Sequence, residues 1–269
     1  MTPLTSANRG TSRLKGAGRL ACLATAIAGL LCAAAATNAR LAGEHGVRTG
    51  AVRARPAQPA RDEPITKRRV LSYAHAINLR AADVSGMIVD GAPEHETPGT
   101  SREGSEIAQC TGFDGEKRQV ADIQSSTYID GASLERTAVS SDVSVLSGAA
   151  FAAREAADLQ SPHGRACIKQ FFWWRAVESG PPPSAVHVST SLLPPQAVGT
   201  DRVFTLRVTV TFPVAGSGLI VPRYFDFFWF VSGPAEIVLS AYGVSGPVSS
   251  STERRLLSLL LSRAAANRL

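Results

Sequence analysis

The chain has 269 residues, of which 44% are hydrophobic and 19% are charged, and its formal net charge is +6. The excess of positive charge lies in the first 70 residues, because 19 acidic side chains outnumber 16 basic ones from Leu71 onward. This distribution excludes a nucleic-acid-binding surface as the reason for the net charge, and no nucleic-acid partner is expected.

The N-terminus resembles an export signal. Basic residues precede the apolar stretch "LACLATAIAGLLCAAAA" (Leu20 to Ala36), and small residues offer cleavage sites after Ala36 or Ala39. We expect residues 1–39 to be a signal peptide. The alternative is an uncleaved membrane anchor over residues 20–39, which would be the chain's only contact with a membrane. Both interpretations make the rest of the chain secreted or extracytoplasmic, because the basic flank stays inside.

Residues 40–70 are rich in Ala, Arg, Pro and Gly and have no apolar period, so we expect a disordered basic linker. Residues 71–269 are then a single domain outside the cytoplasm.

Two cysteines, Cys110 and Cys167, remain after the leader. An even pair in an exported chain predicts a disulfide bond. The alternative is a catalytic thiolate at Cys167 with His163, four residues earlier, as its base. That alternative requires a reduced cysteine, and we expect the disulfide.

The first predicted elements are a short helix and a strand over "NLRAADVSGMIV" (78–89). After a loop that extends to about Ala108, "RTAVSSDVSVL" (136–146) alternates between apolar and polar residues. Its valines would face the core while Asp142 and Ser144 face solvent, which predicts a half-buried strand.

Two helices follow. "SGAAFAAREAADLQ" (147–160) is Ala-rich, with Ser147 as its expected N-cap. "SPHGRACIKQFFWWRAV" (161–177) has Ser161 as its N-cap and proline at the first helical position. The expected core-facing stripe of this second helix is Cys167, Phe171 and Trp174.

Four antiparallel strands are predicted next. "AVHVSTSLL" (185–193) and "VFTLRVTVTF" (203–212) alternate as strands with one covered face do. "RYFDFFWFVSGPAEIVLSAYGV" (223–244) predicts a hairpin around a turn at 232–234. We expect Trp229 on an all-apolar face of this hairpin, opposite a mixed face. A C-terminal helix with a Ser250–Glu253 capping box would pack on the sheet. The fold class is therefore α+β, an antiparallel sheet packed with helices as a sandwich.

The element order, the "AQC…GRAC" pair, "NLRAADVSGM", "VSSDVSVL…AAREAADL" and "TERRLLSLLLSRA" resemble exported actinobacterial proteins. These include the extracellular sensor domain of mycobacterial serine/threonine kinases and related lipoproteins with a PsbP-like fold. The resemblance covers most of residues 75–269 and implies a PsbP-like fold in an extracellular setting. The kinase sensors have a second disulfide, for which this chain has no cysteines, and no kinase segment is present.

Catalytic motifs are missing from the sequence. "YGVSGP" lacks the last glycine of a serine-hydrolase elbow, and there is no His-Glu-x-x-His, phosphate loop or Cys-x-x-Cys. The five histidines have no metal-ligand spacing. We therefore assign no catalytic residue, no metal and no cofactor.

The mixed sheet face is the candidate ligand groove, because polar groups converge there beside aromatic rings. Its residues would be His187, Arg207, Tyr224, Asp226, Glu236 and Tyr242. The alternative is a face that is solvated or covered by a helix. The expected function is a non-catalytic, sensor-like envelope domain that binds a small molecule, a lipid or another envelope component. An extracellular hydrolase with its site on this face, and a purely structural envelope protein, are the alternatives.

Overall fold

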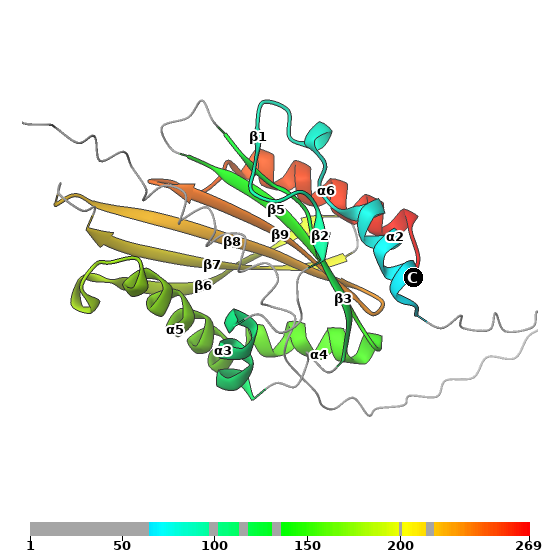
Figure 1. The fold of residues 1–269 in the computed structure, drawn as a ribbon, viewed down its shortest axis with the longest axis horizontal. Coiled ribbons are helices and arrows are strands. Elements are labelled where there is room, and N and C mark those ends of the chain that lie inside the picture. The colour runs from blue at the N-terminus through cyan, green and yellow to red at the C-terminus, as the bar shows by residue number, and fades with distance from the viewer. Residues whose placement is uncertain (1–64, 97–101, 113–117, 131–135, 199–200, 214–217) are drawn as a thin grey trace, which may run out of the picture.

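The computed structural model describes residues 65–96, 102–112, 118–130, 136–198, 201–213 and 218–269 (Figure 1). The predicted signal peptide and almost all of the predicted linker lie outside these residues. The first described helix, α2, spans Lys67–Ile77, and its N-cap Thr66 accepts a hydrogen bond from the Arg69 N–H. The predicted linker was therefore too long at its C-terminal end, where basic residues belong to this helix.

The described strands form one antiparallel sheet in the order β1-β4-β5-β9-β8-β7-β6, with β3 also pairing with β5 and β2 pairing with β3. Strands β6 to β9 follow one another as hairpins, and the long β5–β9 pairing joins them to the N-terminal strands. The strand bounds are Ile88–Asp90 (β1), His95–Glu96 (β2), Gln119–Gln124 (β3), Thr127–Ile129 (β4), Ala138–Leu146 (β5), His187–Val198 (β6), Asp201–Pro213 (β7), Ile220–Ser232 (β8) and Ala235–Val244 (β9).

Helices cover both faces of the sheet (Figure 1). One face packs against α2 and α6, and the other packs against α3, α4 and α5. This arrangement confirms the α+β class with an antiparallel sheet between helices. The remaining helices are α3 (Arg102–Thr111), α4 (Ala149–Gln160), α5 (Pro162–Glu178) and α6 (Ser250–Ala266), with short 3₁₀ turns at Ala81–Asp83 and Pro183–Ala185.

The aromatic hairpin pairs with a register that differs from the prediction by one residue. Ser232 pairs with Ala235, so the turn contains only Gly233 and Pro234, and Gly233 has a φ of 60°. Glycine at the first position is the preference of a two-residue type II′ turn. A slip of one residue exchanges the faces of a strand relative to its neighbour. The predicted all-apolar face therefore does not exist, although the aromatic run is buried central strand as expected.

Helix starts show which of the capping predictions were correct. Ser161 caps α5 and accepts a hydrogen bond from the Gly164 N–H, as predicted. Helix α4 begins after Gly148 without a side-chain cap, so the expected role of Ser147 was wrong. Helix α6 is capped by Ser249, one residue before the predicted cap.

Candidate functional site

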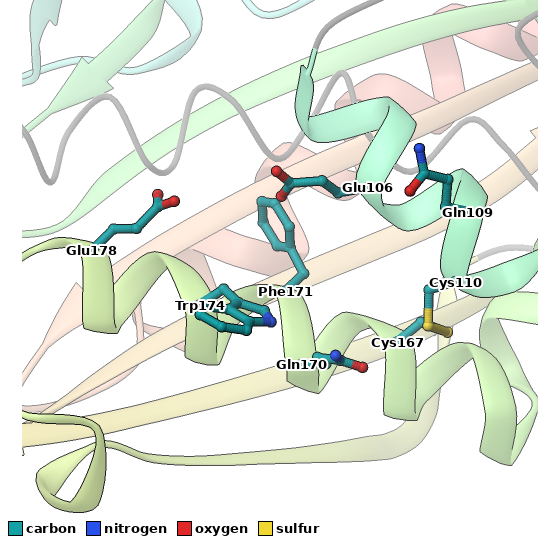
Figure 2. A pocket seen from close by; sticks show the side chains of 8 residues that line it. All are labelled: Glu106, Gln109, Cys110, Cys167, Gln170, Phe171, Trp174 and Glu178. Carbon is teal, nitrogen blue, oxygen red and sulfur yellow. A yellow bond between two sulfur atoms is a disulfide. The ribbon is translucent and has the colours of Figure 1, made fainter.

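A pocket of about 380 Å³ lies between α3 and α5 (Figure 2). We call it the α3–α5 pocket, and its size is within the range of small-molecule sites. Helix α5 provides one wall and helix α3 the facing wall. The lining residues are Glu106, Gln109, Cys110, Cys167, Gln170, Phe171, Trp174 and Glu178.

Helical periodicity explains how these side chains come to share one pocket. Gln170, Trp174 and Glu178 follow at intervals of four residues, so they form one stripe along α5. On α3, Glu106 and Cys110 are also four residues apart and face this stripe. The pocket is therefore a groove between two helix stripes.

A disulfide bond fixes the two helices against each other. Cys110 on α3 is bonded to Cys167 on α5, with their Cα atoms 5.7 Å apart, which confirms the predicted bridge. The His163 ring contacts the Cys110 carbonyl oxygen through Nε2 at 3.0 Å. The His163 Nε2 atom also lies 3.9 Å from the Cys167 sulfur, but that sulfur belongs to the bridge. The structure therefore supports a structural pair rather than a nucleophile and its base.

Aromatic rings occupy the middle of the pocket, between Glu178 at one end and the disulfide at the other (Figure 2). The Trp174 side chain is 51% exposed, and its ring meets the neighbouring Trp173 ring edge-on at 5.0 Å. Phe171, on the same helix, is buried. The prediction that Trp174 belongs to the core stripe was wrong, because no element covers the end of α5 at this position in the described part of the chain.

Among the described residues that line the α3–α5 pocket there are two carboxylates and no lysine, arginine or histidine. Arg175 stands beside the pocket, where its guanidinium pairs with Glu178 at 3.0 Å. The same guanidinium lies over the Phe171 ring at 5.3 Å from the centroid. The pocket thus combines carboxylate side chains with aromatic surface.

The structure does not bring the six predicted ligand residues together. His187, Arg207, Tyr224 and Asp226 lie on the sheet face that packs against α6, according to the strand registers. Glu236 and Tyr242 lie on the opposite face, because they share it with Trp229 and its neighbours. The hairpin register is the reason for this division, and the predicted groove is not one surface.

Asp226 belongs to a buried ion pair. Its two carboxylate oxygens accept hydrogen bonds from the Arg207 guanidinium, each at 2.6 Å, and only 1% of the residue is exposed. The Tyr224 ring lies 5.7 Å from the same guanidinium. Nearby on α6, burial raises the pKa of Glu253 to about 7, with repulsion from Asp226 adding to the shift. This group joins the sheet to α6, while His187 is exposed near the start of β6.

A second group of acids is buried on the opposite face of the sheet. We call Asp122 on β3, Asp142 on β5, Glu155 on α4 and Glu236 on β9 the buried acid layer, since at most 2% of each residue is exposed. Burial raises the pKa of Asp122 to about 7 and the pKa values of Asp142 and Glu236 well above their usual range. The alternation in residues 136–146 predicted that Asp142 faces solvent, which is wrong because α4 covers that side of β5. The layer has no access to solvent.

The described ranges contain neither a metal-binding cluster nor a membrane-spanning helix. Among those residues no group of three or more His, Cys, Asp or Glu side chains has an arrangement that could hold a metal ion. None of the described helices is long and apolar enough to cross a membrane.

Comparison with known proteins gives a weak structural likeness. No protein-family model matches the sequence, and no curated protein matches it. The chain is similar to the crystal structure of the extracellular domain of PknH from Mycobacterium tuberculosis. Their sequences are 12% identical, the match covers 76% of this chain and 98% of that one, and the TM-score is 0.33. A likeness at this level carries no argument about a site or an activity.

Proposed function

We propose that this protein is an exported, non-catalytic ligand-binding domain of the cell envelope, with the α3–α5 pocket as its ligand site. The observation that carries the proposal is Trp174, a half-exposed indole in the wall of a pocket of small-molecule size. Large aromatic side chains are normally covered, and one that stays open within a concave site is typical of a binding surface.

The disulfide supports both the place and the mode of action. Disulfides persist in oxidising compartments outside the cytoplasm, in agreement with the export signal expected from the sequence. The bridge also holds α3 on α5, so the two walls of the pocket are preformed. A preformed site loses less conformational entropy on binding.

The position of the sheet acids favours binding over the hydrolase alternative. Asp226 and Glu236 are the two acids of the predicted sheet-face site, and they lie on opposite faces of the sheet. Asp226 is engaged by Arg207, and Glu236 is fully buried beneath α4. Neither arrangement provides a pair of carboxylates in an open cleft, which glycoside hydrolysis requires.

Native mass spectrometry of the exported protein, purified without denaturation, tests the proposal. We expect a retained small molecule in the parent protein and its loss in two pocket variants. Trp174→Ala removes the aromatic wall, and Gln109→Trp fills the groove from α3. A retained mass that both variants keep would place binding elsewhere. A protein that retains no mass and binds nothing in a fragment screen would contradict the proposal.

A further inference from the structure

We infer that the α3–α5 pocket selects an organic cation, an amine or quaternary ammonium group carried on a small apolar body. The inference deepens the proposed function and rests on it, because it specifies what the same pocket binds.

The charged side chains of the pocket walls are carboxylates. Glu106 from α3 and Glu178 from α5 place carboxylates on both walls of the pocket, and none of the described side chains that line it is basic. Glu178 is 46% exposed and keeps its contact with Arg175 at the rim. A cation that enters the groove therefore meets the Glu106 carboxylate on the α3 wall, while the Glu178 carboxylate on the α5 wall is shared with Arg175.

The aromatic surface of the pocket also favours a cation. The face of an indole attracts cations more strongly than the face of any other side chain, and Trp174 offers an indole that is half exposed. The site already shows this preference within the protein, since the Arg175 guanidinium lies 5.3 Å from the centre of the Phe171 ring. Carboxylates and aromatic faces together are the usual means of binding an ammonium group.

The size and polarity of the pocket limit what else the ligand can carry. A pocket of about 380 Å³ accommodates a fragment-sized molecule rather than a long chain. Gln109 and Gln170 supply amide groups that donate and accept hydrogen bonds on opposite walls. The apolar body of the ligand would cover the Trp174 ring, which removes apolar surface from water.

Three probes of similar size separate charge from shape. Benzyltrimethylammonium carries the cation, benzyl alcohol is neutral and phenylacetate is anionic. Each is titrated into the purified protein with its disulfide intact, and binding is followed by ligand-observed NMR. Spectra of the protein itself show where the probe binds. They follow the indole N–H signal of Trp174, which is assigned by its loss in Trp174→Phe. We expect benzyltrimethylammonium to bind about tenfold more tightly than benzyl alcohol, and phenylacetate to bind most weakly.

Variants test the two walls separately. Trp174→Ala should weaken benzyltrimethylammonium about tenfold, and Glu106→Gln should weaken it about threefold. The effect of Glu106→Gln should shrink at high salt, because a partly exposed charge is screened. Asp158→Asn is the matched control, since it removes an exposed carboxylate of α4 outside the pocket. It should leave the affinity unchanged.

The outcomes show separately whether the ligand class is wrong and whether the binding site is wrong. If benzyl alcohol or phenylacetate binds at Trp174 as tightly as the cation, the ligand class is wrong while the pocket stays the binding site. Equal losses in Glu106→Gln and Asp158→Asn would also overturn the inference, since general charge would then explain binding. If none of the probes shifts the Trp174 signal, both the cation preference and the proposed site fail.

Discussion

Arg263 and Asp83 form a bidentate ion pair between residues 180 positions apart in the chain. The two guanidinium nitrogens donate to the two carboxylate oxygens at 2.8 Å each. Arg263 also donates to the Asn78 carbonyl oxygen at 2.9 Å and to the Ile77 carbonyl oxygen at 3.3 Å. One side chain on α6 therefore satisfies carbonyl groups at the end of α2 that have no partner within the helix.

Replacing this arginine should weaken the α2–α6 layer. Arg263→Ala removes the cationic partner of a mostly buried carboxylate, which keeps, among the described residues, only the bond from the Arg80 N–H, and it leaves two carbonyls without this donor. We therefore expect a loss of about 2–3 kcal/mol in the free energy of unfolding. Urea denaturation measures this loss. Arg254→Ala is the control on the same helix, because Arg254 is exposed and donates its hydrogen bond to the Ser250 carbonyl oxygen of that helix. Equal midpoints for the two variants would mean that the ion pair does not stabilise the fold.

The protein should be more stable at pH 5 than at pH 8. The pKa values of Asp122 and Glu253 are raised to about 7 by burial, and burial also raises the pKa of Asp142 well above its usual range. An acid with a raised pKa in the folded state stabilises the fold fully below about pH 4, its unfolded value, and this contribution is lost as pH rises through 7. Urea midpoints across this range measure the slope. A midpoint that rises steadily from pH 5 to pH 8 would contradict the raised pKa values.

Asp142→Asn tests which acids cause that slope. An asparagine at position 142 keeps the shape, cannot ionise, and can donate a hydrogen bond to Asp122. We expect the free energy of unfolding at pH 8 to increase by about 1–3 kcal/mol, with little change at pH 5. Asp158→Asn on the exposed surface of α4 serves as the comparison at both pH values. A similar change at pH 5 and pH 8 would assign the slope to other groups.

Truncation should cost much more stability at one tryptophan than at the other. Trp229 is fully buried and stacks on Phe204 with ring centroids 5.6 Å apart, so Trp229→Ala should cost about 3–5 kcal/mol. Trp174→Ala removes a ring that is 51% exposed and should cost less than about 1 kcal/mol. Denaturant melts of both variants measure these losses. If Trp229→Ala melts like the parent, the central strand is not core.

The disulfide should stabilise the whole domain as well as the pocket. It closes a loop of 57 residues, and the chain-entropy model assigns such a bridge about 4 kcal/mol. The double variant Cys110→Ser, Cys167→Ser should lose this amount in urea melts, with weaker binding of benzyltrimethylammonium as a second effect. A double variant with unchanged stability and unchanged binding would show that α3 is held on α5 by packing alone.

The order of the elements was largely predictable from the sequence. Period-2 alternation in residues 203–212 gave a strand, and Ser161 with proline after it gave the start of α5. The pairing of Cys110 with Cys167 followed from the composition. Each of these signals is local or compositional, so a single chain carries it.

The register of the hairpin and the covering of the sheet by helices could not be predicted from such local signals. The hairpin register depends on whether Ser232 belongs to the turn or to the strand, and the dihedral angles at Gly233 decide this. The acid layer was missed because alternation separates two sides of β5 but does not say that a helix covers the polar side. Glu155 stands among the buried alanines of α4 and was the available hint.

The α3–α5 pocket could not be predicted because one of its walls was not expected to be a helix. The sequence "REGSEIAQCT" contains glycine and has only one large aliphatic residue, Ile107, so it gives a weak helical signal. Without α3, the exposed stripe of α5 has nothing to face. Trp174 then fits a core pattern equally well, since spacing alone does not distinguish a covered ring from an open one.

The layering of the fold also places the pocket and the N-terminal junction on opposite sides of the sheet. Residues 1–64 join the described domain at α2, and α2 packs on the sheet face opposite α3 and α5 (Figure 1). If that junction is held close to a surface, the sheet itself stands between the surface and the pocket. A molecule arriving from the medium would then approach the half-exposed Trp174 from the side of the domain away from the surface, whereas one embedded in the surface beneath α2 would have to travel around the domain.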